Sequence, residues 1–109
     1  MSTKITEGGK VKTEAVNTER KEYILRLFVT GILPNSVRAV LNIKAICEKY
    51  LNNRYELEII DIYQQPDLAL TEDILAVPVL VKKSPFPEVR MIGDLSNEKK
   101  VLTGLGINH

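Results

Sequence analysis

The chain has 109 residues, a length that suits one domain rather than two. Hydrophobic residues make up 44% and charged residues 27%, and the net charge of +1 provides no long-range attraction for nucleic acid or anionic lipid, so we expect neither as a partner. The single cysteine, Cys47, excludes an intrachain disulfide, and no cysteine and histidine set has metal-site spacing, so we expect no metal, no cofactor and a reducing cytoplasm.

Residues 1–20 mix charged residues with Thr, Gly and Asn and contain no long apolar run. This composition predicts a disordered tail rather than a signal peptide, which needs an apolar core of about 7–15 residues. No stretch of the chain approaches the roughly 18 apolar residues of a membrane span. We therefore assign the folded domain to residues 21–109.

Residues 23–29 read YILRLFV, and only Arg26 interrupts their apolar character. The run predicts a central strand that is covered on both faces. Gly31 and Pro34 end this strand, and Asn35 or Ser36 can cap the helix that follows.

The helix is predicted over residues 37–51, where apolar residues recur every three or four positions and form a broad face. These residues are Val37, Val40, Leu41, Ile43, Ile46, Cys47, Tyr50 and Leu51. Residues 55–61, YELEIID, alternate apolar and acidic side chains and predict a second strand. The order strand, helix, strand implies that the two strands are parallel.

The second half of the chain predicts shorter elements. Pro66 can begin a short helix over 66–75. The β-rich runs 77–83 and 88–92 flank the sequence SPFP, a spacing that suits an antiparallel hairpin.

Residues 96–105 predict a last helix, with Ser96 as its cap and Gly104 as the left-handed residue at its C-terminus. The complete order is βαβαββα. This is the order of a thioredoxin-like α/β domain, a mixed four-stranded sheet with helices on both faces.

In a thioredoxin-like fold the redox position falls on residues 33–36, LPNS, which can form neither a disulfide nor a thiolate. Cys47 lies roughly 17 Å further along the helix, where a cysteine is a small core residue or, alternatively, a regulatory thiol. Without a general base in view, Ser36 is a helix cap rather than a nucleophile. His109 is the only histidine and the terminal residue, so we expect no catalytic role for it.

Pro78 stands where thioredoxin-like folds place a proline that follows a cis bond, opposite the redox turn, and the sequence leaves cis and trans open. The charged residues that we consider for the surface are Arg38, Glu58, Asp73, Arg90 and the pair Lys82 and Lys83. Any one of them alone is ordinarily a solvated charge.

Four stretches, taken in order over residues 22–105, resemble the bacterial circadian clock protein KaiB family. They read YILRLFVTGILPNSVRAV, LEIIDIYQQPDLA, ILAVPVL and VRMIGDLSNEKKVLTGL. The PNSVRA turn and the IGDLSNEKKVLTGL block are specific when they occur together.

The resemblance implies a protein-binding module that performs no chemistry at its turn. Its implied partner is a KaiC-like hexameric ATPase, with the KaiB-like domain of a histidine kinase as competitor. Arg38 and Arg90 match basic residues that the family presents to this ATPase. Glu58 and Asp73 stand where cyanobacterial relatives generally have lysine, which could weaken binding to a cyanobacterial-type partner.

The resemblance also implies a second, resting fold in which the C-terminal half is rearranged within a tetramer. We expect the thioredoxin-like fold here, because Gly104 and Gly106 weaken a strand but suit a helix end. Loss of the resting fold should also lose its tetramer, so we favour a dimer and keep the tetramer as the alternative. Three functions stay open: a timing component that binds a KaiC-like ATPase, a relative that acts in stress adaptation through another partner, and a thiol enzyme. The missing second cysteine argues against the thiol enzyme.

Overall fold

The computed structural model describes residues 21–107, so the predicted tail of residues 1–20 and His109 lie outside the described residues. The elements follow the predicted order βαβαββα. They are β1 (Tyr23–Val29), α1 (Pro34–Tyr50), β2 (Tyr55–Asp61), α2 (Pro66–Thr71), β3 (Val79–Ser84), β4 (Val89–Ile92) and α3 (Glu98–Leu105).

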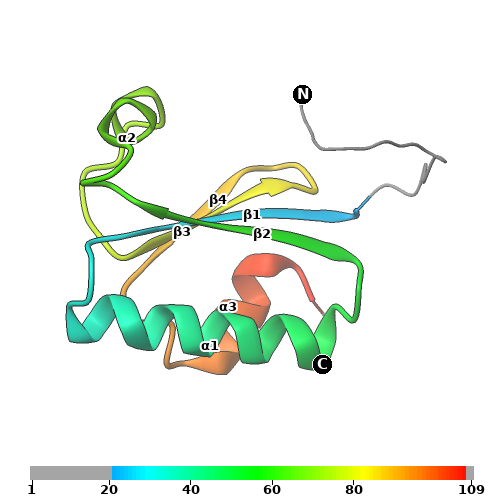
Figure 1. Cartoon of the computed structure of the whole chain (residues 1–109). Coiled ribbons are helices and arrows are strands. Elements are labelled where there is room, and N and C mark those ends of the chain that lie inside the picture. The colour runs from blue at the N-terminus through cyan, green and yellow to red at the C-terminus, as the bar shows by residue number, and fades with distance from the viewer. Residues whose placement is uncertain (1–20, 108–109) are drawn as a thin grey trace, which may run out of the picture.

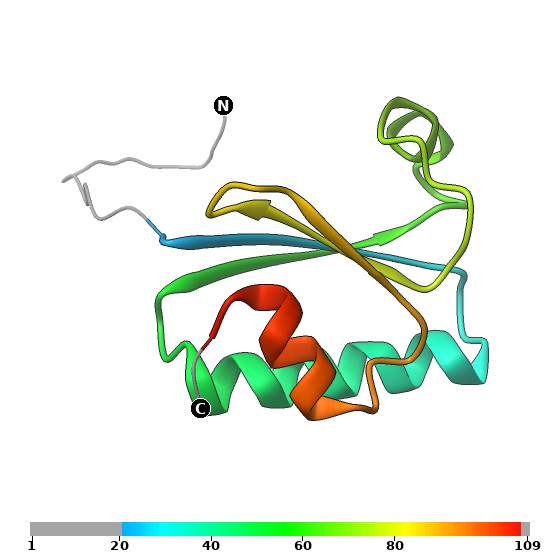
Figure 2. The same ribbon diagram turned by 180° about the vertical axis from the view of Figure 1, so that it is seen from behind.

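The strands form one sheet in the order β2-β1-β3-β4. β1 pairs in parallel with β2 and antiparallel with β3, and β3 and β4 form the predicted antiparallel hairpin. Helices α1 and α3 cover one face of the sheet, and α2 lies on the other face (Figure 1 and, from behind, Figure 2). The predicted mixed sheet with helices on both faces is confirmed.

Strand β1 carries the core because its side chains alternate between the two faces. Leu25 and Leu27 are fully buried in the larger cluster with α1 and α3, while Phe28 is fully buried in a smaller cluster on the α2 face. Arg26 points to the α2 face and is half-buried. The prediction of a strand covered on both faces is therefore correct, with a charged exception at Arg26.

Helix α1 begins at Pro34, three residues earlier than predicted, because proline suits the first helical turn, where its missing N–H loses no bond. Leu33 is the N-cap residue and no side chain caps the helix, so the prediction of a cap at Asn35 or Ser36 is wrong. The apolar face is also narrower than predicted, because Val37 and Leu41 are exposed.

Helix α2 ends at Thr71 rather than near residue 75, and none of its residues is fully buried. Asp73 adopts a left-handed backbone with φ of 58°, which a helical residue cannot have. The helix is short because this left-handed residue turns the chain back toward β3.

Helix α3 corrects two predictions. Asn97, not Ser96, caps it, and the side chain of Asn97 accepts a hydrogen bond of 3.1 Å from the backbone N–H of Lys100. Gly104 lies inside the helix, while Gly106 is the left-handed residue at its end, with φ of 79°. Gly104 is small for another reason, since a Cβ there would lie 2.5 Å from the sulfur of Met91.

Helix α1 is the longest of the described helices, with 17 residues. In the part of the chain that the structure describes, no helix is both long enough and apolar enough to cross a bilayer.

Candidate functional site

The turn between β1 and α1 is held together by Ser36. Its hydroxyl is buried and accepts a hydrogen bond of 3.1 Å from the backbone N–H of Thr30. Ser36 therefore ties the end of β1 to the first turn of α1. This is a structural role, but it differs from the predicted helix cap.

Pro78 faces this turn, as predicted, and the Val77–Pro78 bond is cis. A shallow pocket lies between the turn and this bond, lined by Thr30, Leu33, Pro34, Asn35, Ser36, Val77 and Pro78. None of the lining residues carries a thiol or a side chain that titrates near neutral pH. The pocket thus has no group for redox or acid–base chemistry.

Cys47 is fully buried on the sheet side of α1. Burial, with a smaller contribution from Glu48, raises the pKa of the Cys47 thiol from 9.0 to about 12. Because the thiolate is the reactive form, the thiol is unreactive at neutral pH. The core interpretation of Cys47 is confirmed.

Arg38 lies on the exposed side of α1 and keeps 54% of its side chain exposed. Its Nε donates a hydrogen bond of 3.2 Å to Asp94, and its guanidinium also contacts Asn35. Hydrogen bonds from Ser96 and then Arg38 lower the pKa of Asp94. Arg38 thus joins α1 to the segment between β4 and α3.

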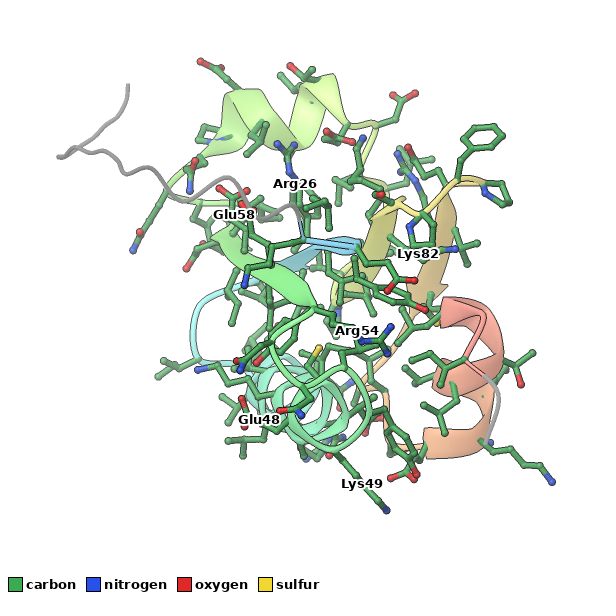
Figure 3. All side chains as sticks on the ribbon, turned by 90° about the vertical axis from the view of Figure 1, so that its right-hand side faces the viewer. Arg26, Glu48, Lys49, Arg54, Glu58 and Lys82 are labelled. Carbon is green, nitrogen blue, oxygen red and sulfur yellow. The ribbon has the colours of Figure 1, made fainter. Side chains whose placement is uncertain are left out.

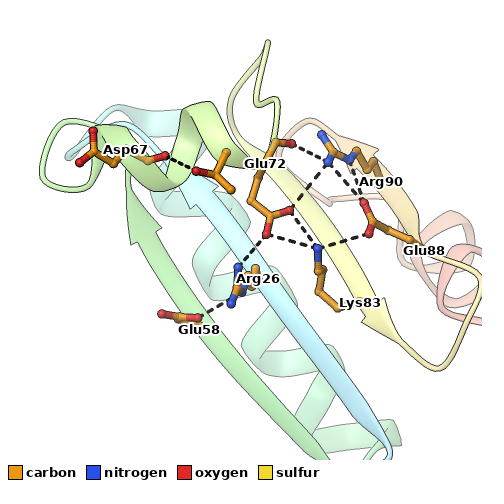
Figure 4. A network of polar contacts seen from close by, with 8 residues as sticks. Arg26, Glu58, Asp67, Glu72, Lys83, Glu88 and Arg90 are labelled. Atoms are coloured by element: carbon orange, nitrogen blue, oxygen red, sulfur yellow. Dashed lines mark hydrogen bonds and ion pairs between the residues drawn. The ribbon is translucent and has the colours of Figure 1, made fainter. Parts of the chain in front are cut away.

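Glu72, just after α2, forms the centre of a charged cluster on the α2 face (Figure 4). Its carboxylate lies 2.8 Å from Arg26 of β1 and 3.0 Å from Lys83 of β3, and its side chain is only 11% exposed. The hydrogen bond to Glu72 raises the pKa of Lys83. We call Arg26, Glu58, Glu72, Lys83, Glu88 and Arg90 the Glu72 cluster.

Three of the four predicted binding residues lie in or beside this cluster. Glu58 lies 3.4 Å from the Nε of Arg26. Arg90 donates to the backbone carbonyl of Glu72 at 2.6 Å and to that of Asp73 at 3.1 Å. Arg90 therefore caps the C-terminal end of α2, and the structure brings Glu58, Asp73 and Arg90 together.

Arg38 does not belong to this group, because it projects from α1, on the opposite face of the sheet (Figure 1). The predicted surface position of Lys82 is also wrong, since Lys82 is 4% exposed between Leu25 and Val89 in the sheet. Strand alternation decides this, because Lys82 and Lys83 point to opposite faces.

Sequence analysis missed the roles of Arg26, Glu72 and Lys83. The one available signal was Arg26, a lone charge in an otherwise apolar strand, which requires a partner when it is half-buried. The identity of that partner could not be read from the sequence, because Arg26 and Glu72 are 46 residues apart.

The sequence was compared with protein families and with individual known proteins, and both comparisons give the same family. The family model described as "KaiB domain" matches residues 26–107. The chain is 47% identical over 92 residues to the "Circadian clock oscillator protein KaiB" of Gloeothece citriformis, covering 84% of this chain and 87% of that protein. It is 49% identical over 88 residues to the protein of the same name from Thermosynechococcus vestitus, covering 81% and 82%.

Solved structures agree on the fold. The N-terminal domain of SasA from Synechococcus elongatus superposes with a TM-score of 0.64 at 23% identity, covering 91% of this chain and 94% of that one. Chloroplastic thioredoxin z superposes with a TM-score of 0.66 at 17% identity, covering 80% of each chain. The thioredoxin-like fold is therefore shared with proteins of low sequence identity.

Proposed function

Because this chain belongs to the KaiB family, we propose that it is a non-enzymatic regulator that binds a KaiC-type ATPase in a circadian or timing system. The observation that carries the proposal is the identity of 47–49% to circadian clock oscillator proteins over four fifths of the chain. The pocket at the turn between β1 and α1 supports the proposal that the protein is not an enzyme. Its lining residues carry no thiol and no side chain that titrates near neutral pH, which suits a binding surface.

We propose that the domain of residues 21–109 binds this ATPase in the cytoplasm. In that compartment a lone thiol such as Cys47 stays reduced. We further propose a dimer as its oligomeric state. A histidine kinase with a KaiB-like domain would compete for the same ATPase. The likeness to the SasA domain supports the competition only through the shared fold.

The two arginines proposed as contact residues, Arg38 and Arg90, differ in how free their side chains are to contact a partner. Arg38 pairs with a single carboxylate, Asp94, and is more than half exposed, so its charge is accessible to a partner. Arg90 is tied to Glu72, Asp73 and Glu88, so its substitution would disturb α2 as well as any contact with a partner. Arg38 is therefore the sharper probe of the interface.

A second candidate function, stress adaptation through another partner, draws support from Glu58. The resemblance places lysine at this position in cyanobacterial relatives, whereas here Glu58 forms an ion pair with Arg26. A carboxylate at the rim of an interface favours a partner of the opposite local charge. The cognate partner would then differ from the cyanobacterial ATPase in its charge at that contact.

The test measures binding of the purified chain to the KaiC-type ATPase from the same genome, at several salt concentrations. We expect Arg38→Glu to weaken binding, most strongly at low salt, because exposed charges act through screened attraction. Arg54→Glu is the matched control, since Arg54 has a similar exposure beyond the far end of α1. Wild-type protein that does not bind the ATPase at any salt concentration would refute the proposed function.

A further inference from the structure

The outer side of α1 carries a row of apolar side chains that nothing in the described chain covers. Leu33, Val37 and Leu41 follow one another at intervals of four residues and are 58%, 43% and 63% exposed. Residues four apart lie on the same side of a helix, so the three form a continuous stripe. We call Leu33, Val37 and Leu41 the α1 stripe.

The stripe is distinct from the core face of α1. The helix packs on the sheet through Ala39, Ile43, Ile46 and Cys47, which are buried. Figure 3 shows α1 end-on, with the sheet above it and α3 beside it, so the remaining side of the helix faces outward. At its N-terminal end the stripe meets Ile32, which is 91% exposed, and the pocket beside Pro78, which Leu33 also lines. Exposed apolar side chains that lie next to one another, rather than singly, are a feature of interaction sites.

Charges on both sides of the stripe indicate what it binds. Arg38 precedes Leu41 by three residues and Lys44 follows it by three, so at 3.6 residues per turn the two cations flank Leu41 on opposite sides. Both side chains are exposed, although Arg38 also pairs with Asp94. Glu48 is the one acidic residue within α1, and it accepts a hydrogen bond of 3.0 Å from the hydroxyl of Tyr55.

The same charges disfavour a second copy of this chain. A two-fold contact through the stripe would bring two copies of Arg38 and two of Lys44 to the rim of one interface. Like charges that meet at an interface oppose association. A partner with carboxylates beside an apolar ridge would satisfy both cations instead.

We propose that the α1 stripe is the docking surface for an apolar segment of the partner ATPase that carries carboxylates on both of its sides. The identity of the partner in this proposal rests on the proposed function. The apolar centre and the carboxylates expected of the partner follow from the side chains of the α1 stripe, Arg38 and Lys44. The stripe supplies the buried centre of the contact, and Arg38 and Lys44 supply its polar rim, as in other specific interfaces.

Two matched pairs of variants test the surface with the ATPase from the same genome as the probe. Leu41→Ser removes the centre of the stripe, and we expect it to weaken binding about tenfold or more, as truncation of a central apolar contact does. Phe86→Ser is its control, because Phe86 is 90% exposed in the turn between β3 and β4. Lys44→Glu should weaken binding at low salt, whereas Lys99→Glu, an equal charge change on the exposed side of α3, should not.

A second probe separates failure of this inference from failure of the proposed function. Backbone NMR spectra are recorded with a synthetic amphipathic helix whose leucine row is flanked by Glu, and with the same peptide carrying Lys in place of Glu. We expect shifts at residues 33–45 with the acidic peptide only. This result supports the surface even if the ATPase does not bind.

Four results would overturn the inference. The first is ATPase binding that Leu41→Ser leaves unchanged, which would keep the proposed function and remove the stripe. The second is an equal response to both peptides or to neither. The third is retention on phosphatidylserine vesicles that Leu41→Ser abolishes, which would assign the stripe to a lipid surface. A change of molecular mass in Leu41→Ser on its own would likewise assign the stripe to self-association.

Discussion

Arg26 of β1 and Glu72, just after α2, form an ion pair of 2.8 Å that joins the centre of the sheet to the end of a helix with no fully buried residue. Helix α2 makes apolar contact with the sheet through Leu68, which is only partly buried. The position of α2 therefore depends strongly on the charged contacts of Glu72.

We predict that Glu72→Gln destabilises the protein by about 1–3 kcal/mol, because it removes the most buried carboxylate of the cluster and leaves Arg26 and Lys83 only the more exposed Glu58 and Glu88. The free energy of unfolding from urea titration measures the loss. Hydrogen exchange should show the largest loss of protection at residues 66–73. Glu88→Gln is the control, and since the Glu88 side chain is 38% exposed it should change stability much less than Glu72→Gln does. Equal effects of the two variants would show that Glu72 has no special role.

Cys47 should make stability depend on pH at the alkaline end. Its pKa is raised from 9.0 to about 12, so the folded state favours the protonated thiol. This contribution is complete below pH 9 and is lost as the pH rises from 9 to 12. The stability difference between wild type and Cys47→Ala should therefore shrink over that range, and a constant difference would contradict the shift.

The same burial predicts that the protein lacks thiol chemistry. Purified wild type should not accelerate the reduction of insulin disulfides by dithiothreitol, and Cys47 should react with a thiol reagent only after unfolding. Cys47→Ser should alter stability alone. Catalytic turnover that disappears in Cys47→Ser would contradict the non-enzymatic assignment.

Gly104 should resist a substitution that usually stabilises helices. Gly→Ala inside a helix gains about 1 kcal/mol, but here the new Cβ would lie 2.5 Å from the sulfur of Met91. We expect Gly104→Ala to gain little or to destabilise, and to recover the helix gain in a Met91→Ala background. A double-mutant cycle measures the coupling. Additive effects would show that Met91 moves aside freely.

Residues 98–105 should be helical in solution, and the protein should be a dimer or smaller. The left-handed Gly106 ends α3, and the side chain of Asn97 caps its start, so both ends of the segment favour a helix. Backbone chemical shifts and light scattering test this prediction. A β-strand over residues 96–104 within a tetramer would identify the rearranged resting fold as the stable state.

The sequence alone determined the order of the elements and the class of the fold. The apolar run of β1, which only Arg26 interrupts, and the spacing of Ile46 and Cys47 three and four residues after Ile43 are local patterns, and local patterns identify strands and helices. The same holds for the absence of a redox motif, because residues 33–36 read LPNS and contain no cysteine. The family was also readable from the sequence, since its motifs are continuous segments of the chain.

Only the tertiary structure decided which side chains meet. Arg90 caps α2 through the carbonyls of Glu72 and Asp73, 18 and 17 residues away, and Gly104 lies closely against the side chain of Met91 in β4. Val37 and Leu41 have the composition of core residues, yet α1 turns them outward because its other side already fills the space against the sheet. The spacing of apolar residues in the sequence indicates whether a segment is a helix or a strand. Which side of that helix or strand faces the core depends on its packing against distant parts of the chain.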